Sequence, residues 1–355
     1  MLHSTNTAPL ATSDAATPAA EPAKPAKRIW AKRLSQYRQA SNARAVFELG
    51  LTFSLFVAGF AATVYLSTLS WFLVPFGMVA SAFMLVRLFI IQHDCGHGSM
   101  FDSRALNTWV GRLIGIITMT PYEYWRHSHA VHHAHSGNLD HRGIGDVVTL
   151  TVEEYRAKSA FGRLKYRLVR HPLVLFGFGP AYVFMLQQRL PVLYMGKGWK
   201  YWASAMFTNV AIVALACLAS PLIGLATYCL IMLPIVAMAA TIGVWLFYVQ
   251  HQFEETGWER TGEWGHEAYA LEGSSYYALP KPLMWLTGNI GIHHVHHMSS
   301  GIPFYRLPEV MRDHPELEEI SRLTLWESFK CARLKLWDEA NKRLVTFKEA
   351  RALPA

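Results

Sequence analysis

Two long runs without charge constrain the fold of this chain more than any other feature of its sequence. No Asp, Glu, Lys or Arg occurs between Glu48 and Arg87, or between Lys200 and Glu254. A helix needs about 20 apolar residues to cross the hydrocarbon core of a membrane, because it rises about 1.5 Å per residue. Each run is therefore long enough for two crossings. The sequence predicts an all-α integral membrane protein with four transmembrane helices in two hairpins.

The distribution of basic residues predicts the orientation of these helices. A basic stretch, Lys24 to Arg44, precedes the first run, while the two turns, which we place near Pro75 and at residues 220–222, contain no Lys or Arg. The positive-inside rule then places both chain termini and the section between the runs in the cytoplasm. The net charge of +8 would face anionic lipid headgroups there. With 52% hydrophobic and 16% charged residues, we expect no nucleic-acid partner.

The composition divides the chain into three sections. These are a disordered, basic N-terminal tail, a membrane domain and a cytoplasmic C-terminal helical segment, at 1–45, 46–306 and 307–355. The tail is rich in Ala and Pro and too polar to bury a core. In the last section Leu325, Phe329, Ala332 and Leu336 recur at helical spacing. We expect that section to form a helical cap over the membrane domain.

Histidine is the second unusual feature, because eight of the 17 histidines fall into three motifs. The motifs are His93-x-x-x-His97, His129-x-x-His132-His133 and His293-x-x-His296-His297. Residues three and four apart share one helical face, so each motif presents its imidazoles together. A single histidine at this depth is more often hydrogen-bonded or directed at headgroups. Three motifs on the same side of a four-helix topology instead predict a shared site, held by the cap.

The shorter apolar pieces are consistent with that topology. Trp109–Thr120 is short and contains Arg112, so we interpret it as an interfacial or re-entrant piece. Pro172–Gln187 has 16 residues and is interrupted by Pro180, so we interpret it as interfacial. A fifth crossing would place the third motif on the wrong side of the membrane. Arg87 is expected to extend toward the cytoplasmic interface.

The number of imidazoles predicts two metal ions. Zinc takes three or four protein ligands, so eight imidazoles exceed what one ion binds. Imidazole suits iron, copper, nickel or zinc, and the ligands alone do not choose among them. Apolar helices beside the site would admit an alkyl chain, which favours oxygen activation by iron. A hydrolytic zinc pair is the alternative.

The three motifs in this order resemble those of the membrane fatty-acid desaturase family, most closely the acyl-lipid Δ12 (omega-6) and omega-3 desaturases. The likeness extends over residues 47–310 and includes Gly145-Asp146-Val147 after the second motif. It implies that a cis double bond is introduced into a lipid acyl chain by two Fe ions, with O2 as co-substrate. By the same resemblance the metal ligands are His93, His97, His129, His132, His133, His251, His293, His296 and His297. His251 ends the second charge-free run, where an interfacial histidine is the alternative.

The electron donor is expected to be a separate protein of the ferredoxin or cytochrome b5 type, because no His-Pro-Gly-Gly haem motif occurs. A basic docking face for it, formed by Lys330, Arg333 and Lys335, competes with the interpretation of a solvated helix face.

Other functions stay open at this point. A related di-iron hydroxylase or ketolase would share the same histidines. A metal-binding transporter would need polar ligands near the bilayer midplane, where this chain has no charge. We also predict that Asp94, Asp140 and Asp146 orient ligand imidazoles, with surface carboxylates as the alternative. The remaining motif neighbours are expected to be solvent-facing or to lie behind the ligands: His127, His135, His141, His266, His294 and His314.

Overall fold

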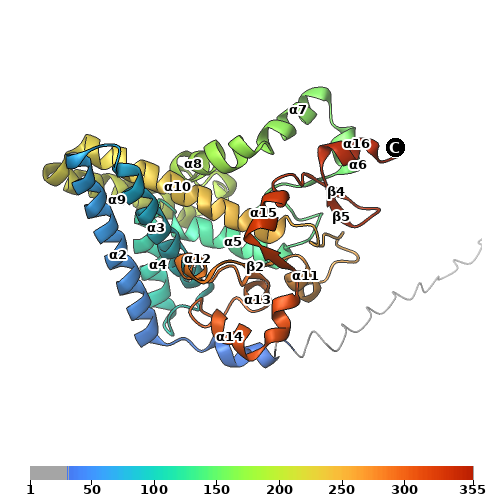
Figure 1. The fold of residues 1–355 in the computed structure, drawn as a ribbon, viewed down its shortest axis with the longest axis horizontal. Coiled ribbons are helices and arrows are strands. Elements are labelled where there is room, and N and C mark those ends of the chain that lie inside the picture. Colours follow the sequence, from blue (N-terminus) through green and yellow to red (C-terminus); the bar gives the residue numbers. More distant parts are fainter. Residues whose placement is uncertain (1–29, 31, 355) are drawn as a thin grey trace, which may run out of the picture.

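The computed structural model describes residue 30 and residues 32–354, and four of its helices are long and apolar enough to cross a membrane. Figure 1 shows them gathered at one side of the molecule. They are α2 (Asn42–Leu69), α3 (Val74–His97), α9 (Trp199–Ile223) and α10 (Leu225–His251). Four helices are what the charge-free runs predicted. The predicted disorder of the tail up to about residue 25 lies outside the described residues.

The breaks between paired helices lie a few residues from their predicted positions. Residues 70–73 separate α2 from α3, and Gly224, with φ of 79°, alone separates α9 from α10. Pro75 belongs to the first turn of α3, where its missing N–H costs no hydrogen bond. A Cβ added to Gly77 would lie 2.4 Å from Oγ1 of Thr63, so α2 and α3 pack at a distance that requires glycine.

The predicted interfacial pieces form helices of different regularity. The first lies mostly in α4 (Arg104–Ile117). The second is irregular and π-helical around Pro180, and meets the preceding α7 (Ala160–Val169) at 55°. The two together are apolar enough for a fifth, broken crossing, so their interfacial position stays a prediction. The irregular elements are η2 (Val174–Phe178), α8 (Gly179–Ala181), η3 (Tyr182–Leu186), η4 (Gln187–Arg189) and η5 (Val192–Tyr194).

The all-α prediction is wrong in the part outside the long helices, which contains two small sheets. One has the order β1 (Leu150–Thr151), β4 (Leu336–Asp338), β5 (Arg343–Val345), and the other pairs β2 (Tyr276–Ala278) with β3 (Arg322–Thr324). The helical pattern near the C-terminus stops with α15 (Leu325–Cys331). Leu336 and Trp337 are buried by pairing with β1 and β5, so tertiary contacts override the helical spacing there.

Short helices complete the histidine-bearing end. They are η1 (Ser35–Arg38), α5 (Tyr122–His135), α6 (Val152–Ala157), α11 (His266–Glu272), α12 (Lys281–Leu286), α13 (His293–Met298), α14 (Leu307–Asp313), η6 (Pro315–Glu319) and α16 (Phe347–Ala352).

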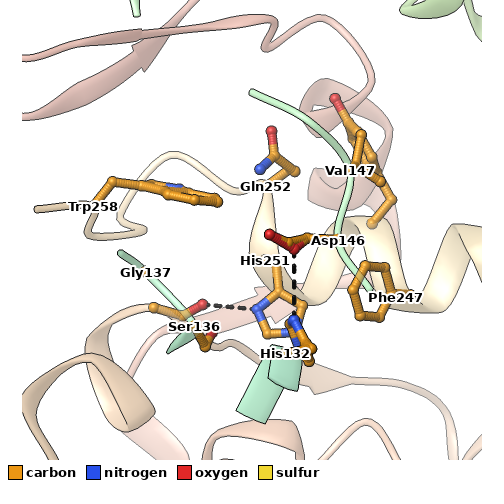
Figure 2. Close-up of a pocket in the computed structure, with 11 residues that line it drawn as sticks. His132, Ser136, Gly137, Asp146, Val147, Phe247, His251, Gln252 and Trp258 are labelled. Atoms are coloured by element: carbon orange, nitrogen blue, oxygen red, sulfur yellow. Dashed lines mark hydrogen bonds and ion pairs between the residues drawn. The ribbon is translucent and has the colours of Figure 1, made fainter. Parts of the chain in front are cut away.

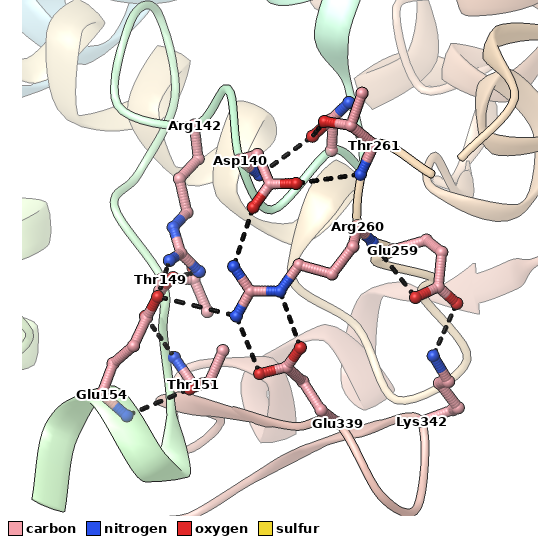
Figure 3. A network of polar contacts seen from close by, with 11 residues as sticks. Asp140, Arg142, Thr149, Thr151, Glu154, Glu259, Arg260, Thr261, Glu339 and Lys342 are labelled. Carbon is pink, nitrogen blue, oxygen red and sulfur yellow. Dashed lines mark hydrogen bonds and ion pairs between the residues drawn. The ribbon is translucent and has the colours of Figure 1, made fainter. Parts of the chain in front are cut away.

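A polar network fixes the loops of this end to one another (Figure 3). Arg260 binds Glu339 and Asp140, with 2.9 Å to Glu339 and 2.8 Å to Asp140, and Lys342 binds Glu259 at 2.6 Å. The loop after α5, the loop after α10 and the β4–β5 hairpin are thereby joined. Hydrogen bonds from the Thr261 N–H and from Arg260 lower the pKa of Asp140 to about 2. Asp140 faces these groups and no histidine, so its predicted role in orienting a ligand is wrong.

Two basic residues have buried positions that the sequence did not predict. Arg87 is 1% exposed and binds Glu48 at 2.7 Å, so the predicted extension toward the interface is wrong. A buried guanidinium needs a partner, and α2 supplies one. Lys335 donates to the Arg170 carbonyl at 2.7 Å, and burial lowers its pKa to about 8. Lys335 is therefore not part of an exposed docking face.

Candidate metal centre

The nine predicted ligands lie together at the ends of α3, α5, α10 and α13. Two groups have all their candidate ligand nitrogens within 4.8 Å of one another. The larger group is His93, His97, His129, His133 and His296, and the smaller is His132, His251 and His297. His293 adjoins the smaller group, because its Nε2 lies 3.0 Å from Nε2 of His251. The nine side chains thus divide into sets of five and four.

Local structure explains why residues so distant in sequence meet here. α3 and α10 each end at a histidine of the cluster, and α5 presents three more on one face. The third motif forms the two turns of α13 and follows Gly288 and Asn289, both with positive φ. A Cβ on Gly288 would lie 2.8 Å from Ile90, so this loop presses directly on α3. The loop thereby brings the third motif against the first.

The imidazole nitrogens face one another at distances that suit a shared cation. The Nε2–Nε2 separations are 3.0 Å for His97 and His129, 3.1 Å for His133 and His296, and 3.2 Å for His132 and His251. Ligands about 2.1 Å from one metal ion and at right angles are about 3.0 Å apart. The nitrogens therefore have the spacing of neighbouring ligands on a common ion.

One tautomer can be assigned from its partner. Nδ1 of His251 lies 3.0 Å from the carbonyl oxygen of Gly273, which only accepts hydrogen bonds. Nδ1 must carry the proton, so Nε2 presents its lone pair to Nε2 of His132 and of His293. Converging lone pairs repel unless a cation or proton lies between them, so this set of nitrogens fits a metal ion.

Burial keeps cluster imidazoles of α5 and α13 neutral, which is the form that binds metal. The pKa values of His129, His133, His293, His296 and His297 are all held well below 6.5, first by burial and then by neighbouring imidazoles. Neutral rings offer a lone pair at neutral pH, so no proton has to be displaced.

Two of the three predicted carboxylates lie beside the cluster. Oδ1 of Asp94 is 3.0 Å from Nδ1 of His93, and its Oδ2 accepts the Phe304 N–H at 2.6 Å. Asp94 can therefore hold the His93 ring in one orientation. Oδ1 of Asp146 is 3.7 Å from Nδ1 of His132, too far for a hydrogen bond. Asp146 and His132 line a cavity of about 10 Å³ together with His251 and Trp258 (Figure 2). A cavity of that volume can hold about one water molecule.

An aromatic wall beside the histidines was not predicted from the sequence. Trp125 stacks on His129 with ring centroids 4.7 Å apart, Phe89 lies 5.2 Å from Trp125, and Phe247 lies 5.0 Å from His132. The sequence does contain a signal for these aromatic residues. Each of these aromatic residues precedes a cluster histidine by four positions on a helix, and so shares its face.

Among the other histidines, His294 differs most from its prediction. It is fully buried, and its Nε2 lies 3.0 Å from the Leu317 carbonyl oxygen. Burial lowers its pKa to about 4. Its ring thus fastens α13 to η6 and faces away from the cluster. His127, His141 and His266 are exposed, as expected, and His266 contacts the His133 carbonyl oxygen at 3.1 Å.

Four apolar helices, two of which end in a buried cluster of imidazoles, are consistent with an integral membrane protein that has a candidate metal centre. The sequence pattern described as fatty acid desaturase matches residues 69–329. A fatty acid desaturase of Bacillus subtilis is 42% identical over 91% of both chains. The chain belongs to the fatty acid desaturase family and is therefore an oxidoreductase of lipid metabolism.

More distant relatives have more specific names. An sn-1 acyl-lipid omega-3 desaturase (ferredoxin) of Synechocystis is 28% identical over 77% of both chains. An sn-1 oleoyl-lipid 12-desaturase of the same organism is 25% identical over 72% of both chains.

Proposed function

We propose that this protein is an oxygen-dependent acyl-lipid desaturase of the Δ12 (omega-6) type, which introduces a cis double bond into monounsaturated acyl lipids. The observation that carries the proposal is the pair of facing imidazole sets beside an aromatic wall. The acyl-lipid substrate is supported by the names of the two Synechocystis relatives.

The nine histidines would hold two iron ions, five around one and four around the other. The chemistry that iron supplies is oxidation: two hydrogens leave adjacent methylenes, and O2 with two electrons and two protons becomes two waters. A hydroxylase would use the same ligands, so the protein must favour the second hydrogen removal by positioning the chain.

The residues of this chain would bind and orient the substrate. Apolar rings lie beside both imidazole sets, Phe89 and Trp125 beside the larger and Phe247 beside the smaller, and an acyl chain would pack against them. Phe184, whose ring centroid is 6.1 Å from that of Phe89, extends the rings beside the larger set to the π-helical segment. Asp94 and the Gly273 carbonyl oxygen fix the rings of His93 and His251.

The electrons would come from a separate donor of the ferredoxin or cytochrome b5 type, and the ferredoxin relative supports the former. In the proposed topology, two hairpins open toward the cytoplasm, and the active site and both termini face it. The tail (1–45), the membrane domain (46–306) and the capping segment (307–355) would be the functional sections.

Expression in a host with only saturated and monounsaturated lipids tests the reaction. We expect diunsaturated acyl chains with the second bond in the Δ12 position, measured by mass spectrometry of derivatised lipids. Hydroxylated chains in place of diunsaturated ones would assign the protein to the hydroxylases, and unchanged lipids in the presence of a reducing donor would contradict the proposal.

Single cysteines test the proposed orientation. Lys158→Cys and Lys348→Cys, both on the histidine-bearing end, should react with an impermeant thiol reagent only after cells are opened. Phe72→Cys, in the opposite turn and 90% exposed in the wild type, should react in intact cells. Reaction of the cysteine at position 158 in intact cells would show that the histidine-bearing end faces outward, which would contradict a cytoplasmic active site.

A further inference from the structure

The exposed face of α15 is the surface with the least obvious partner in the C-terminal section. Trp326 is 79% exposed and Phe329 is 54% exposed, although both are large and aromatic. The rest of α15 is firmly placed: Thr324 and Glu327 form a capping box, and Ser328 and Cys331 are buried. The helix is therefore held so that these two rings point outward.

These two rings continue an aromatic row that begins on a membrane-spanning helix. The Trp326 and Phe329 ring centroids are 6.1 Å apart, and Phe329 is 5.5 Å from Trp245 of α10. Trp245 in turn contacts Phe176 of the irregular segment, at 4.9 Å. Figure 1 shows α15 lying beside α10 near the end that carries His251. Phe329 therefore lies against the side of an apolar helix, close to the end that carries His251.

Basic residues flank the same face. Lys330 follows Phe329, Arg333 lies just beyond the helix, and Arg322 precedes it, all three exposed. Glu327 is the acidic residue on this helix, and its carboxylate is used in the cap, accepting from the Thr324 N–H at 2.9 Å. Aromatic rings with Lys and Arg beside them match the boundary between acyl chains and anionic headgroups.

We propose that α15 is a membrane anchor: Trp326 and Phe329 insert into the leaflet nearest the histidines, while Lys330, Arg333 and Arg322 contact anionic phospholipid headgroups. The occupant of this face is thus the bilayer, because the row of rings continues onto Trp245 of the apolar helix α10 and is flanked by exposed basic residues. A face for a protein electron donor would need no such continuity.

The anchor also lies against the elements that carry the cluster. Oη of Tyr248, three residues before His251, donates to the Leu334 carbonyl oxygen at 2.8 Å. Oη of Tyr277 lies 2.9 Å from Oγ of Ser328 in α15. Docking of α15 on lipid would therefore stabilise both the end of α10 and the strand before the third motif.

Spin labelling of the full chain in vesicles tests the anchor. Trp326→Cys and, as matched control, Lys348→Cys on the exposed face of α16 are each labelled with a nitroxide after Cys217→Ala and Cys229→Ala. The vesicles contain phosphatidylcholine with or without phosphatidylglycerol. The ratio of oxygen to nickel-chelate collisions should be several-fold higher at position 326 than at position 348.

The outcomes separate the parts of the proposal. An equally low ratio at both positions would overturn the anchor, and immobilisation of the label at 326 by added ferredoxin would assign the face to a protein. A deeper label with phosphatidylglycerol that is lost in Lys330→Gln/Arg333→Gln supports the headgroup contacts. An identical depth in both lipids would overturn those contacts.

Discussion

Replacing His132 with alanine should abolish desaturation. His132 belongs to the smaller imidazole set, and its Nε2 is 3.2 Å from that of His251 in a buried site. Without it three imidazoles would remain for one ion, and the lone pair of His251 would face only that of His293. Loss of a metal ligand is among the few single changes with effects of several orders of magnitude. Diunsaturated product should fall below detection, measured per mole of purified protein with a chemical reductant.

The matched control is His141→Ala. His141 lies in the loop after the second motif, is exposed, and belongs to neither imidazole set. Its replacement should leave turnover within about twofold of wild type, since surface changes away from a site are usually neutral. Equal losses in the two variants would show that the cluster does not separate ligands from bystanders.

Replacing Arg87 with methionine should lower the free energy of unfolding by about 1–3 kcal/mol, because Oε2 of the buried Glu48 carboxylate loses its partner while Oε1 keeps Arg44 at 2.6 Å. Glu48 is 2% exposed, so no water compensates it. The Arg87 guanidinium also lies 4.2 Å above the Trp285 ring and binds Oγ1 of Thr52 at 3.2 Å. The pair thus joins α2 and α3 to α12, and unfolding in detergent measures its loss.

Two further variants check that reason. The double variant Glu48→Gln/Arg87→Met should recover most of the lost stability, because it leaves no buried charge, and Arg44, which loses Glu48, has an exposed side chain. Arg312→Met removes an arginine whose side chain is 72% exposed and should cost less than about 1 kcal/mol. A double variant as unstable as Arg87→Met would contradict the ion pair as the cause.

The transmembrane helices and the histidine motifs could be predicted because both follow from local regularities. An absence of charge over a whole run identifies a membrane helix without reference to the rest of the chain, and helical spacing places His129, His132 and His133 on one face. His251, which belongs to no motif, was implied by the family resemblance, and its place at the end of such a run made it plausible. These residues required no knowledge of distant contacts.

The predictions that were wrong concern residues whose partners lie far away in the sequence. Arg87 is buried because Glu48 lies 39 residues before it on a neighbouring helix. The helical spacing ending at Leu336 is overridden by pairing with Leu150, and Asp140 is taken by Arg260, 120 positions away. A local pattern contains no information about such contacts, so tertiary structure decides them.

Metal analysis of purified, active protein tests the central claim most directly. Under the proposal, five imidazoles in one set and four in the other would bind two ions through neutral nitrogen ligands and leave positions for oxygen. Elemental analysis should therefore give two irons per chain, with Mössbauer spectra of nitrogen-ligated iron, and His132→Ala should lose close to one of them. One zinc and no iron in protein that still desaturates lipids would contradict the assignment.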